Sequence, residues 1–135
     1  MKCALCDGDG GALLLRDEFC RVVRPEVAGY PGFVRVVLNR HVREMTDLAP
    51  AERDRLMRAV FACEKALLAL YKPEKINLAS FGNQVAHVHW HVIARFRDDA
   101  HFPDPTWAAP RRVASAPAMI ADAVLAAEIR KLSAG

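Results

Sequence analysis

Three histidines recur at alternate positions within residues 87–93, whose sequence is HVHWHVI. In an extended strand, successive side chains point to opposite faces, so His87, His89 and His91 would share one face and the intervening apolar residues the other. The apolar face can be buried against a core. The imidazole face would bring together three groups that can bind a metal ion, attack an electrophile or carry a proton.

Three explanations account for such a face. The imidazoles can be polar groups on the solvated side of an edge strand, although a face made only of histidine is unusual there. They can all bind one zinc ion, as in catalytic centres with three histidine ligands. Alternatively, one histidine attacks while its neighbours orient it and stabilise the developing charge. Residues two apart on a strand lie about 6.6–7 Å apart at Cα, so one phosphate could contact two adjacent rings.

The segment GNQVA precedes the first of these histidines and favours a phosphorylated ligand. Gly82 supplies backbone freedom, and Asn83 and Gln84 supply amide groups that can donate to phosphate oxygens without adding charge.

A second candidate site is the C-x-x-C pair Cys3 and Cys6. In a reducing compartment this spacing favours metal binding or redox chemistry over a structural disulfide. A thioredoxin-like role is disfavoured because no βαβ pattern surrounds the pair. Cys20 and Cys63 lie in apolar surroundings and are interpreted as small buried hydrophobic residues.

Composition predicts one domain over residues 1–135, with 53% hydrophobic and 26% charged residues. The net charge is +3, and lysine and arginine form no dense block, so we expect no nucleic-acid partner. No stretch approaches the roughly 20 apolar residues of a membrane span, and the first residues lack the apolar segment of a secretory signal. We therefore expect a cytoplasmic protein without membrane contact.

Periodicity and turn residues predict the elements that position these sites. Alternating and β-branched runs favour strands, three- and four-residue apolar spacing favours helices, and Thr46 and Asp47 are candidate caps for the long helix. This order of elements predicts an α+β fold with an antiparallel sheet of about five strands and its helices on one side. The expected strands are 12–16, 19–24, 33–39, 75–81 and 87–96, and the expected helices are 51–71 and 117–132.

The run H-V-H-W-H-V-I resembles the signature of the histidine triad (HIT) superfamily, and G-N-Q-V-A resembles the amide-bearing segment before it. The likeness extends over residues 3–97, through a P-G turn, an N-R-H segment (39–41) and a D-L helix start (47–48). Residues 98–135 match less well and are expected to form a loop and a closing helix.

The resemblance implies a mechanism residue by residue. His89 would be the nucleophile that attacks the α-phosphorus of a nucleotide and becomes transiently nucleotidylated, and water would then release the nucleoside monophosphate. His91 would contact the phosphate and leaving group. Asn83 takes the place of a glutamine found in dinucleoside polyphosphate hydrolases of the family and is one methylene shorter, with Gln84 as an alternative. No divalent metal is expected to be essential for this chemistry.

The resemblance also implies a metal site and a dimer. A zinc-bearing branch of the superfamily combines a cysteine pair with two histidines, which here correspond to Cys3, Cys6, His41 and His87. Such a closed Cys-Cys-His-His shell would be structural, with no open position for substrate. The alternative is two reduced surface cysteines and an exposed His41. The fold resemblance further implies a homodimer.

Four other residues are expected near the ligand or its loops. Glu26 lies where relatives place a group against the ribose, and Phe33 replaces a histidine found in several relatives. Trp107 could form a lid over the substrate or anchor its loop to the core. Arg95 could contact phosphate, or be solvated at the end of its strand.

The predicted function is therefore a nucleotide hydrolase or nucleotidyltransferase that acts on a dinucleoside polyphosphate or a nucleoside phosphoramidate through a covalent histidine intermediate. One alternative is a non-catalytic module that binds a nucleotide or a partner. Another is a zinc-dependent hydrolase in which all three triad histidines are ligands.

Overall fold

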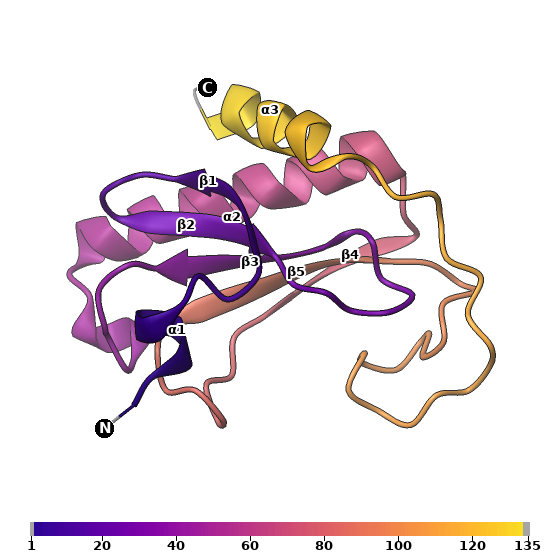
Figure 1. Cartoon of the computed structure of the whole chain (residues 1–135), viewed down its shortest axis with the longest axis horizontal. Helices are drawn as coiled ribbons and strands as arrows, with labels where there is room; N and C mark the ends of the chain where they lie inside the picture. Colours follow the sequence, from indigo (N-terminus) through magenta and orange to yellow (C-terminus); the bar gives the residue numbers. More distant parts are fainter. Residues whose placement is uncertain (1, 134–135) are drawn as a thin grey trace.

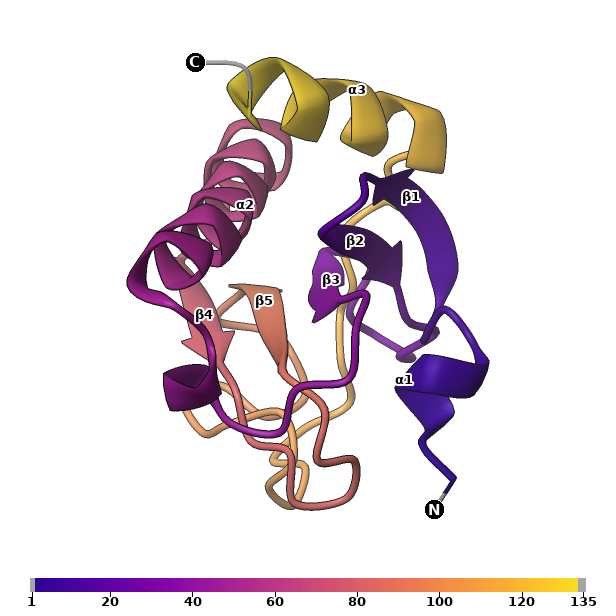
Figure 2. The same cartoon turned by 90° about the vertical axis from the view of Figure 1, so that its left-hand side faces the viewer.

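The computed structural model describes residues 2–133 and has the predicted α+β fold. Its five strands form one antiparallel sheet in the order β1-β2-β3-β5-β4, and the two longer helices pack on one face of that sheet (Figures 1 and 2). In chain order the elements are α1 (Ala4–Asp7), β1 (Ala12–Arg16), β2 (Cys20–Arg24), β3 (Phe33–Leu38), the 3-10 turn η1 (Met45–Asp47), α2 (Pro50–Tyr71), β4 (Lys75–Ala79), β5 (His89–Arg95) and α3 (Asp122–Ser133).

The main hydrophobic core lies between α2 and the sheet. The predicted apolar stripe of α2 is buried there and meets alternate residues of β3, including Val34 and Val36, whose side chains are fully buried. Because side chains alternate along a strand, Arg35 points to the opposite face. The face of the sheet toward α2 therefore forms the core, and the opposite face is available for a binding site.

Helix α2 begins at Pro50, and its N-cap is Ala49, so the expectation that Thr46 or Asp47 caps it is wrong. The carboxylate of Glu52 accepts a hydrogen bond from the backbone N–H of Ala49 at 2.9 Å, which satisfies a donor at the helix start. The Asp47 carboxylate accepts the backbone N–H of Glu44 at 3.2 Å and so belongs to the preceding 3-10 turn.

The short helix α1, which periodicity does not predict, lies on the face of the sheet opposite α2 (Figure 2). Its Leu5 side chain packs against Val23 and Val37. The guanidinium of Arg21 donates to the carbonyl oxygens of Leu5, at 2.5 Å, and Gly8, at 3.1 Å. These contacts hold the N-terminal segment, with its two cysteines, against the sheet.

Several predicted strand ends differ from the observed ones by one or two residues, and the predicted start of the closing helix differs by five. The last strand, β5, begins at His89 and not at residue 87, although Val88 still exchanges backbone hydrogen bonds with Leu38 and Val42. The closing helix begins at Asp122 and not at residue 117, and an irregular segment precedes it. The first difference matters because it separates His87 from the ladder that carries the other two triad histidines.

The segment after β5 is held by a buried ion pair between Arg95 and Asp99, whose side chains are each 2% exposed. Arg95 is therefore neither a phosphate contact nor a solvated end of the strand. Within residues 2–133, no helix combines the length and the apolar character that crossing a membrane requires.

Candidate functional site

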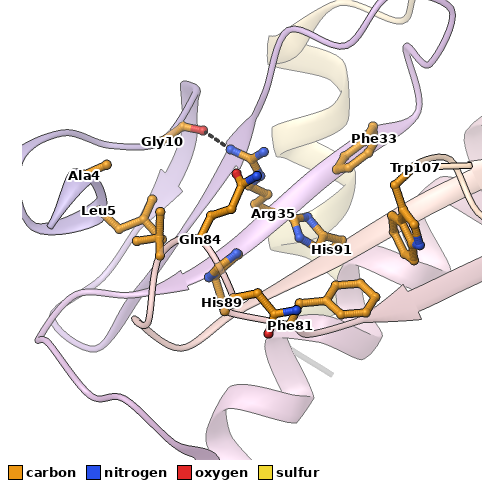
Figure 3. Close-up of a pocket in the computed structure, with 13 residues that line it drawn as sticks. Ala4, Leu5, Gly10, Phe33, Arg35, Phe81, Gln84, His89, His91 and Trp107 are labelled. Atoms are coloured by element: carbon orange, nitrogen blue, oxygen red, sulfur yellow. Dashed lines mark hydrogen bonds between the residues drawn. The ribbon is translucent and has the colours of Figure 1, made fainter.

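A cavity of about 660 Å³ opens on the face of the sheet opposite α2. Figure 3 shows imidazole rings at its centre, Arg35 and the α1 segment toward one end, and three aromatic rings toward the other. Its volume lies within the range of small-molecule sites, about 300–1,000 Å³. The side chains with polar or aromatic groups in its wall are Phe33, Arg35, Phe81, Asn83, Gln84, His89, His91 and Trp107.

His89 is buried and held in a defined orientation. Its Nδ1 lies 2.6 Å from the backbone carbonyl oxygen of His87, which can only accept a hydrogen bond, so Nδ1 carries the hydrogen. In the neutral ring the lone pair then resides on Nε2, and the ring lines the cavity (Figure 3). This is the arrangement that a histidine nucleophile requires.

His91 stands beside His89 in the same cavity. The two ring centroids are 5.1 Å apart with nearly perpendicular planes, and Phe33 packs edge-on against the other side of His91 at 5.6 Å. Burial, together with the neighbouring His89 and Arg35, lowers the pKa of His91 to about 4. Its Nδ1 has no hydrogen-bond partner among residues 2–133. The cavity is therefore lined by a neutral ring that has an unused hydrogen-bonding nitrogen.

The amide segment lies at the cavity as expected. Gly82 has φ +84°, a conformation that favours glycine, and the chain after it brings Asn83 and Gln84 to the wall. Glu26 is exposed after β2 and does not line this cavity. Of the residues assigned to the ligand, the three before the triad are therefore brought together with His89, and Glu26 is not.

The four predicted metal ligands form one cluster. The side-chain donor atoms of Cys3, Cys6, His41 and His87 all lie within 4.8 Å of one another. His87 Nδ1 is 3.4 Å from Cys3 Sγ, 3.5 Å from Cys6 Sγ and 3.3 Å from His41 Nδ1, and Cys6 Sγ is 3.5 Å from His41 Nδ1. This cluster could hold a metal ion.

The buried ring of His87 is directed toward this cluster. Its Nε2 donates to the carbonyl oxygen of Leu38 at 2.6 Å, which leaves Nδ1 as the free lone pair directed at the cysteines. Burial lowers the pKa of His87 and favours the neutral form that metals bind. Because His87 turns to this cluster and His89 and His91 do not join it, the three triad rings do not form one zinc site.

Sequence reasoning missed Arg35 as a residue of the site and favoured Trp107 as an apolar anchor of its loop over a lid. Trp107 is 57% exposed, lines the cavity and packs edge-on against Phe81 with ring centroids 4.6 Å apart. Arg35 could have been recognised from the sequence, because it is a charged residue inside the β-branched run FVRVV. Side-chain alternation along the strand places it on the face away from the core.

Comparison with known proteins is consistent with this site. The HIT domain family matches residues 11–98. Histidine triad proteins from Bradyrhizobium japonicum and Sinorhizobium meliloti are 27% and 25% identical, and each match covers 91% of this chain and 90% of the other, with a TM-score of 0.72.

A more distant structure, a hypothetical histidine triad nucleotide-binding protein from Sulfolobus tokodaii, is 16% identical and shares the fold, with a TM-score of 0.61 over 92% of this chain and 84% of that one. No curated protein gives a significant match. The match to the HIT domain family spans β1 to β5 and includes both His89 and His91. The chain therefore belongs to the HIT domain family.

Proposed function

We propose that the protein is a nucleotide hydrolase or nucleotidyltransferase in which Nε2 of His89 attacks the α-phosphorus of a nucleotide. The observation that carries this proposal is the 2.6 Å hydrogen bond from His89 Nδ1 to the carbonyl oxygen of His87, which directs the free lone pair of a buried ring to a cavity. Membership of the HIT family and the nucleotide-binding name of the Sulfolobus tokodaii protein support a nucleotide as the ligand.

The reaction has two balanced steps. His89 forms a P–N bond while the bond from phosphorus to the leaving group breaks, and the leaving group departs with that electron pair. Water, or an acceptor in a transferase, then attacks the same phosphorus and loses a proton to the released leaving group or to bulk water. The electron pair of the P–N bond returns to the imidazole. Charge on the phosphoryl oxygens is stabilised by His91 and by the amides of Asn83 and Gln84, so this chemistry depends on positioning and electrostatics.

The nucleobase is assigned to the aromatic end of the cavity. Phe81 and Trp107 are 53% and 57% exposed, which is a large apolar area to leave in water, and with Phe33 they form the wall beyond His91. A base has a π-face that stacks on such rings whatever its identity. Phosphates would then extend across the imidazoles.

We further propose that the cysteine–histidine cluster binds one structural zinc ion. Zinc lies about 2.3 Å from cysteine sulfur and about 2.0–2.1 Å from histidine nitrogen, so a tetrahedral site places nitrogens about 3.3 Å apart and nitrogen about 3.5 Å from sulfur. Four of the six separations fit this geometry, at 3.3 Å between the two Nδ1 atoms and 3.4–3.5 Å from nitrogen to sulfur, and the other two are within 4.8 Å. Four protein ligands leave zinc no open position, so its contribution would be to fix His87 and the N-terminal segment.

The decisive experiment is mass spectrometry of the intact protein after brief exposure to adenosine 5′-phosphoramidate or diadenosine tetraphosphate. We expect a mass increment of one nucleoside monophosphate that maps to a peptide containing His89. His89→Asn should lose both the adduct and turnover, whereas His101→Asn, outside the cavity, should retain them. Turnover that survives His89→Asn would refute the nucleophile assignment.

A non-catalytic nucleotide-binding module is the second candidate, since fold and motif alone do not ensure turnover. It predicts saturable nucleotide binding with no adduct and no hydrolysis in the wild-type protein. The homodimer implied by the family resemblance stays a prediction, which sedimentation or light scattering would test.

A further inference from the structure

Among residues 2–133, Arg35 is the one residue in the wall of the cavity that carries a permanent charge. In the described part of the chain no aspartate or glutamate lines the cavity with it, and its guanidinium makes a single hydrogen bond there, from NH1 to the carbonyl oxygen of Gly10 at 3.1 Å (Figure 3). Its Nε is buried and has no partner among residues 2–133. The side chain therefore carries a positive charge that no carboxylate in this part of the chain pairs with, and it has unused hydrogen-bond donors.

A partly buried positive charge raises the free energy of the folded protein unless an anion pairs with it. Removing a charged group from water without a partner is strongly unfavourable, and burial lowers the pKa of this guanidinium for that reason. The buried arginines of the described chain are better satisfied than the half-buried Arg35: Arg95 pairs with Asp99 and Arg24 with Asp122. The third, Arg21, has no carboxylate partner among the described residues but donates to four oxygens. Arg35 differs from them because it faces the ligand space, where a bound anion would supply the missing partner.

The position of Arg35 separates it from the groups that would hold the reacting phosphate. Arg35 on β3 is the direct cross-strand partner of His91 on β5, and such partners have Cβ atoms about 4.5–5.5 Å apart. Figure 3 shows its guanidinium beside Gln84, with Trp107 on the far side of His91. A phosphate bound by His89 and His91 would thus have the nucleobase toward Trp107 and its leaving group toward Arg35.

We propose that Arg35 is a specificity-determining residue that binds a phosphate of the leaving group, so that the protein prefers nucleotides whose leaving group is itself a phosphate, such as dinucleoside polyphosphates, over nucleoside phosphoramidates. This inference rests on the proposed function. Arginine presents a planar fork of donors that matches phosphate oxygens in pairs, whereas the amine released from a phosphoramidate offers no anion to it. When His89 attacks, the bond from the α-phosphorus to the bridging oxygen breaks, and the released phosphate keeps the electron pair as a negative charge that Arg35 neutralises.

The kinetic test compares diadenosine tetraphosphate with adenosine 5′-phosphoramidate, which share the nucleoside and the proposed intermediate. For Arg35→Met, which keeps the length of the side chain without charge, we expect the ratio of kcat/KM for the tetraphosphate to that for the phosphoramidate to fall about 10- to 100-fold. Arg97→Met, which removes an arginine that is 75% exposed, should leave the ratio unchanged. An unchanged ratio in Arg35→Met would overturn the proposal. It would also be overturned if kcat/KM fell equally for both substrates and only the preference between nucleobases changed.

A binding experiment keeps this proposal distinct from the catalytic one. In His89→Asn, which cannot form the intermediate, calorimetry would compare ATP with AMP before and after Arg35→Met. We expect Arg35→Met to lower the affinity for ATP about 10-fold or more relative to the affinity for AMP, whether or not the wild-type protein turns over substrate. Equal affinities for the two ligands, or equal losses, would contradict it. If Arg35→Met fails to fold, Arg35→Lys, with charge but no fork, should reduce the same preference partially.

Discussion

The carbonyl oxygen of His87 lies 2.6 Å from Nδ1 of His89, and through this hydrogen bond the cysteine–histidine cluster is joined to the proposed nucleophile. The ring of His87 is fixed on both sides, by Leu38 at Nε2 and by the cluster at Nδ1. Its backbone carbonyl in turn fixes the tautomer of His89. A metal ion that stabilises His87 would therefore contribute to orienting His89 without contacting substrate.

Removal of the metal is expected to lower stability first. Cys6→Ser should reduce the zinc content, measured by elemental analysis, from about one ion per chain to well below one, because a hydroxyl is a poor zinc ligand. Loss of the ion should lower the melting temperature by at least about 5 °C, since a structural metal contributes to folding free energy. We expect kcat to fall as well, but only partially, as His89 becomes less well oriented.

Cys20→Ala is the matched control, because Cys20 is buried in the main core and is not one of the four residues of the cluster. It should cost some stability while zinc content stays at that of the wild type. Full zinc content in Cys6→Ser, or immediate and complete loss of activity on chelation with the melting temperature unchanged, would contradict a structural metal.

The pH dependence of stability should reveal the lowered pKa of His91. The ring titrates near 6.5 in the unfolded chain and near 4 in the folded protein, because burial disfavours its charged form. Between these values the unfolded state binds the extra proton, so the stabilisation from this group is complete above about pH 6.5 and is lost as the pH falls toward 4. Urea unfolding at pH 7 and pH 5 should show a larger loss for the wild type than for His91→Gln, which cannot titrate. Equal losses, or an NMR titration of His91 near its ordinary value, would contradict this.

The shared face of His89 and His91 was predictable from sequence because strand alternation is a local rule. His89 and His91 lie two residues apart on one strand, so any strand assignment puts them on one face. Alternation alone could not predict the separation of His87, since it depends on where β5 stops pairing and on contacts with Leu38 and Val42 far away in the chain. Side-chain alternation predicts on which face of the sheet a residue lies, but it does not predict which other segments pack on that face.

The metal-compatible cluster and Arg35 illustrate this limit. Cys3 and His87 are 84 positions apart and meet because Arg21 ties the backbone of α1 to the sheet, an arrangement that no periodicity encodes. Only the family resemblance indicated that cluster. Arg35 sits in an ordinary β-branched strand, and whether it reaches solvent or a cavity depends on the segment after β4 and on α1.

The aromatic end of the cavity predicts a specific kinetic change. Trp107→Ala should raise KM for an adenine nucleotide about 10-fold, because it removes a stacking surface worth about 1–3 kcal/mol for a base. The effect on kcat should be small, since Trp107 lies beyond His91 and does not touch the proposed nucleophile. Phe61→Ala, which removes an exposed aromatic ring from α2, should leave KM unchanged. An unchanged KM in Trp107→Ala would place the base elsewhere.

The carboxylate of Asp99 organises the segment that carries Trp107. It accepts two hydrogen bonds from Arg95, at 2.8 and 3.0 Å, and one from the hydroxyl of Tyr30 at 3.0 Å. Three backbone N–H groups also donate to it, those of Phe96, His101 and Phe102. Burial acts to raise the pKa of Asp99, but these hydrogen bonds outweigh it and hold the pKa well below its usual range.

Asp99→Asn should therefore be among the most damaging conservative substitutions. It leaves Arg95 as a buried charge without its partner, and breaking such a pair costs about 3–5 kcal/mol, which denaturant unfolding at neutral pH would measure. Asp104→Asn, in the same segment but paired with Arg111 at the surface, should change stability little. Because the folded pKa of Asp99 is depressed, the difference between the wild type and Asp99→Asn should be full above the ordinary carboxyl value of 3.8 and should shrink as the pH falls below it. A stability of Asp99→Asn close to that of the wild type would show that the segment is held by other contacts, and the position of Trp107 in the cavity wall would then not depend on the pair.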